Sequence, residues 1–231
     1  GEPTGEIPLS PTQQRIVEAA LNIDRDVTGL SFTISVRVSP DSLRRGLSAL
    51  LAHHDALRVQ FTAGSKGWRQ FCPASAEQSP FRYIDLSAST PSEQDRRIAD
   101  IQQEEQTGID LAKGPAVRFA LVDMGATAGQ RLLVAVHNLV CDRLSLGILR
   151  EDIDRLCAAA ANDTLPLLGP KTAPFRRWAT DLVSYAGSEG AQAEIDFWRA
   201  LPWRDAASLR REPDCPHELH ETTFALAEPQ T

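Results

Sequence analysis

Residues 132–143 have the sequence LLVAVHNLVCDR, and this stretch predicts the centre of the fold. The first part, 132–136, is apolar at every position, which is typical of a strand buried on both faces and placed centrally in a sheet. The second part, 137–143, is a loop with polar and charged side chains directly after that strand. Because the carboxyl end of a buried strand is a common place for binding and chemistry, residues 137–143 form the candidate site.

Short apolar or alternating segments on both sides of this stretch predict the other strands of the sheet. They are bounded by Gly, Ser and Pro, which favour turns. The expected strands are 32–38, 57–61, 67–71, 81–85 and 117–121. Residues 125–130 are expected to form a hairpin turn leading into the central strand.

Ser or Thr followed by Pro marks three helix starts, because the hydroxyl caps the helix and Pro fits its first turn. Gln13 and Glu93 stand where a capping box requires them. The three pairs are Ser10–Pro11, Ser39–Pro40 and Thr90–Pro91, and a fourth helix after the loop carries the stripe Leu146, Leu149, Ile153 and Leu156. The pattern therefore predicts an α/β fold in which helices pack against a sheet.

The composition fits an enzyme-like domain. A chain of 231 residues with 42% apolar content can bury a full core, and a net charge of −7 argues against general attraction to nucleic acid. No stretch approaches the roughly 18 continuous apolar residues of a membrane span, and the N-terminus lacks the features of a signal peptide. We therefore expect a cytoplasmic protein without membrane or nucleic-acid partners.

The cysteines and histidines predict no metal centre. Cys72, Cys141, Cys157 and Cys215 show no CxxC pairing, which favours reduced thiols. Cys141 is expected to be a small buried residue rather than a nucleophile. Residues 215–220 contain Cys215, His217 and His220, but their spacing matches no common zinc site.

Five segments together resemble parts of the condensation domains of nonribosomal peptide synthetases. Residues 137–143 resemble the family's His-His-x-x-x-Asp-Gly motif, and 10–15 resemble its Ser-x-x-Gln-x-Arg pattern. Residues 53–61, HHDALRVQF, resemble Arg-His-Glu-x-Leu-Arg-Thr-x-Phe. Residues 175–179 and 196–199 are similar to the segments that bridge the two lobes in that family.

The resemblance implies a chloramphenicol-acetyltransferase-like N-terminal lobe with a mixed sheet and helices packed against it. It predicts a lobe at 1–174, followed at 175–231 by bridging helices and the start of a second lobe that is otherwise absent. The first strand of that second lobe is expected at 222–226. In the family the active site lies in a tunnel between the lobes, so either the polypeptide continues or this is a free-standing half.

The resemblance also assigns roles in the loop. The family's second His orients or deprotonates the attacking amine, and Asn138 stands at its position. An amide cannot take a proton near neutral pH, and loss of a positioned acid–base group typically costs about 10²–10⁴-fold in rate. His137 matches the first His of the motif, which is largely structural.

Two further positions complete the comparison with the motif. In the family the Asp pairs with the Arg of the earlier motif, so a buried bridge from Asp142 to Arg58 is expected to hold the loop. Losing one partner of such a pair typically costs about 3–5 kcal/mol. Arg143 replaces the motif's Gly; it would obstruct a pantetheine arm, pair with a carboxylate or phosphate, or simply be exposed.

Three functions are compatible with this pattern. The favoured one is a catalytically impaired condensation-like module of a nonribosomal peptide or hybrid polyketide assembly line. Such a module binds a peptidyl or acyl carrier protein, an adjacent synthetase domain or a tailoring enzyme. The second is an acyl or aminoacyl transferase that condenses carrier-bound thioesters by altered chemistry, as a fragment of a two-lobe enzyme. The third is an unrelated interaction module with chance motif matches. The first two imply phosphopantetheine-linked substrates but no cofactor bound directly.

Overall fold

The structure is a computed structural model that describes residues 4–19, 23–65, 67–76 and 80–203. Contacts divide the chain into two compact units, Gly1–Gly187 and Ser188–Thr231. The expected boundary after residue 174 precedes this division, and the helix between the two positions packs on the first unit through Ala179. The strand expected at 222–226 and the residues Cys215, His217 and His220 lie outside the described residues.

A four-stranded mixed sheet forms the main layer of the first unit. Its order is β2 (Val27–Ile34), β7 (Gln130–His137), β6 (Val117–Asp123) and β5 (Phe81–Asp85). The pairs β2–β7 and β7–β6 are antiparallel, whereas β6–β5 is parallel. The prediction that residues 132–136 form a central strand is confirmed, because β7 lies between two partners and these residues are buried.

A second, three-stranded antiparallel sheet has the order β1 (Gly5–Ile7), β4 (Gly67–Cys72) and β3 (Gln60–Gly64). The expected strand at 57–61 is wrong in its first half, where the 3₁₀ turn η2 (Asp55–Arg58) stands. The Leu57 N–H donates to the His54 carbonyl within this turn, so strand pairing begins only at Gln60.

The strand expected at 32–38 is also displaced, since β2 ends at Ile34. The apolar–polar alternation continues beyond that point, but Val36 is exposed. Val38 is instead held by the side chain of Gln130, whose Oε1 accepts from the Val38 N–H at 2.8 Å. A side-chain contact therefore replaces the ladder that the alternation predicts.

The helices are α1 (Pro11–Ala19), α2 (Pro40–His53), α3 (Pro91–Thr107), α4 (Gly125–Ala128), α5 (Arg143–Ala161), α6 (Phe175–Ala186) and α7 (Glu189–Ala200), with a 3₁₀ turn η1 (Ile23–Arg25). Helices α1, α2 and α3 begin at the three predicted Ser–Pro or Thr–Pro pairs. Ser10 and Gln13 form the expected capping box, as do Thr90 and Glu93. The short α4 lies inside the expected hairpin turn. Within the described residues, none of these helices has the length and apolar character needed to cross a membrane.

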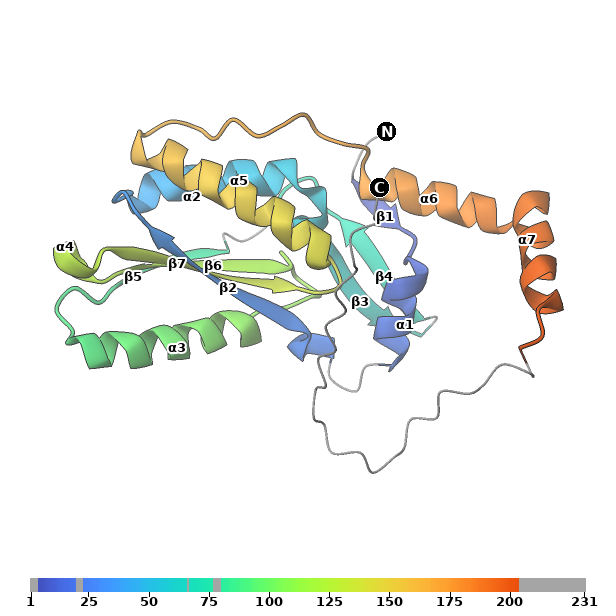
Figure 1. Cartoon of the computed structure of the whole chain (residues 1–231), viewed down its shortest axis with the longest axis horizontal. Helices are drawn as coiled ribbons and strands as arrows, with labels where there is room; N and C mark the ends of the chain where they lie inside the picture. Colours follow the sequence, from blue (N-terminus) through green and yellow to red (C-terminus); the bar gives the residue numbers. More distant parts are fainter. Residues whose placement is uncertain (1–3, 20–22, 66, 77–79, 204–231) are drawn as a thin grey trace, which may run out of the picture. The chain divides into compact units, whose positions relative to one another are not determined.

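The helices cover both faces of the four-stranded sheet. Helices α2 and α5 lie on one face and α3 on the other (Figure 1). Another apolar cluster packs the three-stranded sheet against Ala135 of β7 and Leu139 of the loop. Val140 contacts this cluster and also the α2–α5 cluster. The loop after β7 therefore lies where two apolar clusters meet.

Candidate functional site

The loop from Asn138 to Asp142 connects β7 to α5 and borders an open pocket of about 440 Å³. The N-terminal part of α1, Ala56 of η2, Ser145 of α5, and Phe175 and Trp178 of α6 complete the wall. All these elements belong to the first unit. The site predicted from the sequence therefore coincides with a pocket at the carboxyl end of the central strand.

His137 is fully buried at the end of β7. Its Nε2 lies 2.9 Å from the Ile23 carbonyl oxygen, and the Leu139 N–H donates to its Nδ1 at 3.2 Å. Because one partner is an acceptor and the other a donor, Nε2 carries the proton and the ring is neutral. The imidazole holds the loop backbone, and the neighbouring Asn138 faces the pocket instead.

Asn138 is held by the first residues of the β2 region. Its Oδ1 accepts from the Thr28 hydroxyl at 2.7 Å, and its Nδ2 donates to Asp26 Oδ1 at 2.7 Å. Its backbone N–H donates to the Asp26 carbonyl at 2.9 Å. The donor and the acceptor of the amide are both engaged, so Asn138 is fixed in orientation and offers no group that takes up a proton.

Gln13 links the first helix to the loop. It is buried, and its Nε2 donates to the Leu139 carbonyl at 2.9 Å and to Gln70 Oε1 at 3.2 Å. The sequence singled out Gln13 as a cap, and the structure adds this second role. Asp26, Thr28 and Gln70 were not expected at the site, because no local pattern indicates that they meet residues far along the chain.

Asp142 is the N-cap of α5 rather than the partner of Arg58. Its carboxylate accepts from the Ser145 N–H at 2.8 Å, and this hydrogen bond holds the pKa of Asp142 below its ordinary value. The residue is exposed. The backbone N–H groups of the first turn of α5 carry partial positive charge. They attract the carboxylate of Asp142 and hold it at the start of the helix.

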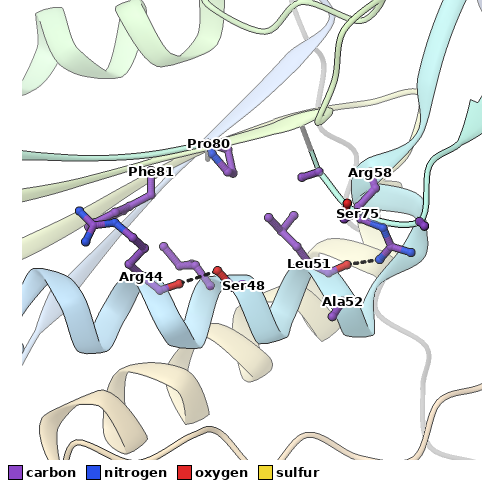
Figure 2. A pocket seen from close by; sticks show the side chains of 11 residues that line it. Arg44, Ser48, Leu51, Ala52, Arg58, Ser75, Pro80 and Phe81 are labelled. Carbon is purple, nitrogen blue, oxygen red and sulfur yellow. Dashed lines mark hydrogen bonds between the residues drawn. The ribbon is translucent and has the colours of Figure 1, made fainter. Parts of the chain in front are cut away.

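The expected Arg58–Asp142 bridge is wrong. Arg58 is buried and pairs with Asp55 at 3.0 Å, within the same 3₁₀ turn. Its guanidinium also donates to the Leu51 carbonyl (Figure 2). It donates to the Pro73 carbonyl as well, at 3.3 Å. Asp55 takes the place expected for Asp142 because it lies three residues before Arg58 in the same turn, and the Leu51 carbonyl near the end of α2 accepts a further hydrogen bond from Arg58.

Arg58 borders a different pocket, of about 320 Å³, between α2 and β5. Arg44, Leu51 and Phe81 also line it (Figure 2). The Arg44 guanidinium lies 5.3 Å from the centre of the Phe81 ring. This pocket shares no lining residue with the one beside Asn138, so Arg58 supports the α2 end and not the loop.

Residues 4–218 match the condensation-domain family. The chain belongs to the condensation-domain family. It is 36% identical over 210 residues to a component of linear gramicidin synthase from Brevibacillus parabrevis, covering 90% of this chain and 3% of that protein. It is 31% identical to chondramide synthase cmdD from Chondromyces crocatus, covering 86% of this chain and 5% of that protein. The chain thus spans a small part of these relatives.

Solved condensation-family structures share the fold. The epimerization domain from the third module of tyrocidine synthetase B aligns with a TM-score of 0.76 and 27% identity, over 90% of this chain and 45% of that one. The starter condensation domain of rhizomide synthetase aligns with a TM-score of 0.70 and 19% identity, over 84% and 47%. The predicted chloramphenicol-acetyltransferase-like lobe is confirmed, and the third hypothesis, chance motif matches in an unrelated module, is wrong.

Cys141 of the loop and Arg143, the first residue of α5, differ in exposure. Arg143 is exposed at the first turn of α5 and does not line the pocket. Cys141 is buried, and burial raises the pKa of its thiol to about 11. Neither arrangement supplies a nucleophile, since a thiol with this pKa is protonated near neutral pH.

Proposed function

We propose that this chain is the first lobe of a condensation-type module of a nonribosomal peptide assembly line in which proton-transfer chemistry is impaired and binding is retained. The observation that carries the proposal is Asn138, at the pocket position that corresponds to the family's second His. Its amide is tied to Asp26 and Thr28. The loop keeps a defined shape around a group that cannot act as a base.

The chemistry explains the expected impairment. Condensation joins an amine nitrogen to a thioester carbonyl, releases a thiol and requires that the nitrogen lose a proton. Asn138 cannot accept it, and both ring nitrogens of His137 are engaged inside the core. Loss of a positioned base lowers the rate by about 10²–10⁴-fold, so positioning alone would leave a slow reaction.

The pocket supports a role in binding carrier-linked groups. Ile16, Val140 and Trp178 provide apolar walls, while Thr12 and Ser145 provide hydroxyl groups. A pantetheine arm combines an alkyl chain with amides, so walls of both kinds suit it. We therefore propose peptidyl or acyl carrier proteins and adjacent synthetase domains as partners, with phosphopantetheine arriving on the carrier. The two relatives named above are synthases, and their names do not point to a tailoring enzyme.

A second candidate is acyl transfer by altered chemistry, in which the substrate supplies its own base. The likeness to an epimerization domain adds a related reaction, removal and return of a proton at a carbon atom of a carrier-bound residue. Both reactions transfer a proton in the pocket that Asn138 lines, whether the acceptor belongs to the substrate or to the protein. One variant at Asn138 therefore tests both.

Asn138→His is expected to increase amide formation about 10²–10⁴-fold, because the imidazole restores an acid–base group and Asp26 remains available to orient it. The measurement is product formation by the native polypeptide that carries this sequence, with aminoacyl-loaded carrier proteins. Epimerization is measured in the same samples by the chirality of the bound residue. Asn138→Gln is the matched control, since it keeps an amide and adds no base.

Binding is measured separately, by titrating phosphopantetheinylated and unmodified carrier protein. We expect the modified carrier to bind the wild type and both variants alike. Fast turnover by the wild type that is abolished in Asn138→Gln would favour altered chemistry over impairment. No preference for the modified carrier would contradict the binding role.

A further inference from the structure

A cluster of metal-capable side chains lies between the end of α2 and the middle of α5. It consists of His53 and His54, the last residue of α2 and the next, together with Asp152 of α5. One potential ligand atom from each side chain lies within 4.8 Å of the others. Over the part of the chain that the structure describes, this is the one such group of three.

The three side chains already face one another. His54 Nε2 lies 2.8 Å from Asp152 Oδ2, and the two imidazole rings meet edge to face with centroids 4.8 Å apart. Asp152 is buried, whereas the two histidines are partly exposed. The second oxygen, Oδ1, accepts from the Arg155 guanidinium at 2.6 Å. Asp152 thus presents Oδ2 to the histidines while Arg155 fixes the carboxylate from behind.

We propose that His53, His54 and Asp152 bind a divalent transition-metal ion of the zinc type, with water in the fourth position. Two imidazole nitrogens and one carboxylate oxygen are a donor set that Zn²⁺ accepts, with bonds of about 2.0–2.2 Å. Tetrahedral bonds of that length place ligand atoms about 3.3 Å apart. The distance between His54 Nε2 and Asp152 Oδ2 would increase from 2.8 Å as the ion replaces the shared proton. The ring of His53 would move closer to both by side-chain rotation.

Space and charge around the cluster permit an ion. The three residues line an open pocket of about 600 Å³, which leaves room for a water ligand. Two cations lie nearby, and both are paired with carboxylates: Lys171 pairs at 2.7 Å with Asp55, which also pairs with Arg58. Arg155 pairs with Asp152 Oδ1 and, at 3.4 Å, with Glu151. A hydrogen bond to the outer oxygen of a ligating carboxylate orients it for the metal.

The inference does not rest on the proposed function, because His53, His54 and Asp152 do not border the pocket beside Asn138; the two pockets are neighbours that share Ala56, Phe175 and Trp178. The sequence predicts no metal site, since its local spacing of metal-capable residues at 215–220 fits none. His53 and His54 are separated from Asp152 by about a hundred residues, so only the packing of α2 on α5 brings them together.

The test is titration of the chelator-treated 231-residue chain with Zn²⁺ by calorimetry, and with Co²⁺ by absorption spectroscopy. The starting protein carries Cys215→Ser, His217→Ala and His220→Ala, which removes the metal-capable Cys and His side chains of residues 215–220. We expect binding of one ion per chain and a cobalt spectrum of nitrogen and oxygen ligation. His53→Ala and Asp152→Asn should each weaken binding by at least ~10–100-fold.

Asp154→Asn is the matched control, because Asp154 is an exposed carboxylate on the same helix outside the cluster. The Asp154→Asn variant should bind Zn²⁺ with unchanged affinity. Thermal unfolding in chelator verifies that each variant folds. If Asp152→Asn does not fold, the test rests on His53→Ala, because His53 is partly exposed. Failure of the starting protein to bind one ion, or equal affinity in His53→Ala, would overturn the proposal.

Discussion

Asn138 and His137 are neighbours in the sequence but have different surroundings. His137 points into the core, where the Ile23 carbonyl and the Leu139 N–H engage its two ring nitrogens. Asn138 faces the pocket and is anchored to Asp26 and Thr28. Consecutive residues at a strand end point to opposite sides, so His137 cannot replace the base that is missing at position 138.

Asp142→Ala is expected to lower the free energy of unfolding by about 0.5–2 kcal/mol, the usual cost of losing an N-cap. The reason is loss of the hydrogen bond from the Ser145 N–H to the carboxylate. Urea denaturation of the wild type and the variant measures the change. Asp142→Ser is the control, since Ser also caps helices and should recover most of the loss.

A loss of about 3–5 kcal/mol in Asp142→Ala would contradict this account, because that is the cost of breaking a buried ion pair. The same result would favour the Arg58 bridge that the family resemblance implies. The observed geometry assigns that role to Asp55.

At the level of elements, α2 and α5 pack closely at a glycine. A Cβ atom added at Gly46 would lie 2.8 Å from Cγ of Leu156, which is fully buried. Gly147, on α5, has no atom within 4 Å of the corresponding position. The two helical glycines therefore differ in packing but not in helix propensity.

Gly147→Ala is expected to raise the free energy of unfolding by about 0.5–1 kcal/mol, because Ala favours the helix. Gly46→Ala gains the same propensity but overpacks the core, which typically costs about 1–3 kcal/mol. We therefore expect Gly46→Ala to be the less stable of the two variants by at least ~1 kcal/mol. Thermal and urea unfolding provide the comparison. Equal stabilisation of both variants would mean that the α2–α5 contact is looser than described.

Local sequence predicts where some helices and strands begin and end, and it fails for others. The capping boxes at Ser10 and Thr90 were predicted because they involve residues three apart. The end of β2 was not, because it depends on Gln130, a residue of another strand that holds Val38. The 3₁₀ turn before β3 was also missed, since apolar content alone does not separate such a turn from a strand.

At the level of the whole molecule, buried Asp123 joins segments from across the four-stranded sheet. Burial acts to raise the pKa of Asp123. Hydrogen bonds from the Gly125 N–H, Arg37 and Gln130 outweigh burial and hold the pKa below its ordinary value. A lowered pKa in the folded state stabilises the fold above the unfolded pKa of about 3.9, and this contribution is lost as pH falls through the folded pKa.

The urea midpoint is therefore expected to be lower at about pH 3 than at about pH 7, and the pH dependence to be smaller in Asp123→Asn. Asp100→Asn is the control, because Asp100 is an exposed aspartate of α3. Asp123→Asn should destabilise the chain near neutral pH and have little effect in acid. An equal loss at both pH values would show that packing, rather than the charge, explains the contribution of Asp123.

The amino-acid sequence alone established the α/β class, the central strand, the loop that follows it, the helix caps and the condensation-domain family. These features depend on residues close together in the chain, or on motifs of a few residues in a fixed order. For the same reason, it placed Asn138 at the candidate site and indicated that the group there, an amide, cannot accept a proton.

The folded chain was needed to establish which side chains meet. It paired Arg58 with Asp55 instead of Asp142, anchored Asn138 to Asp26, and brought His53 and His54 beside Asp152. The Asn138 and His53–His54 contacts join residues about a hundred or more positions apart, and the Arg58 pairing depends on a turn that the strand pattern concealed. Strand register and helix packing set such distances, and neither is contained in the local pattern of any one segment.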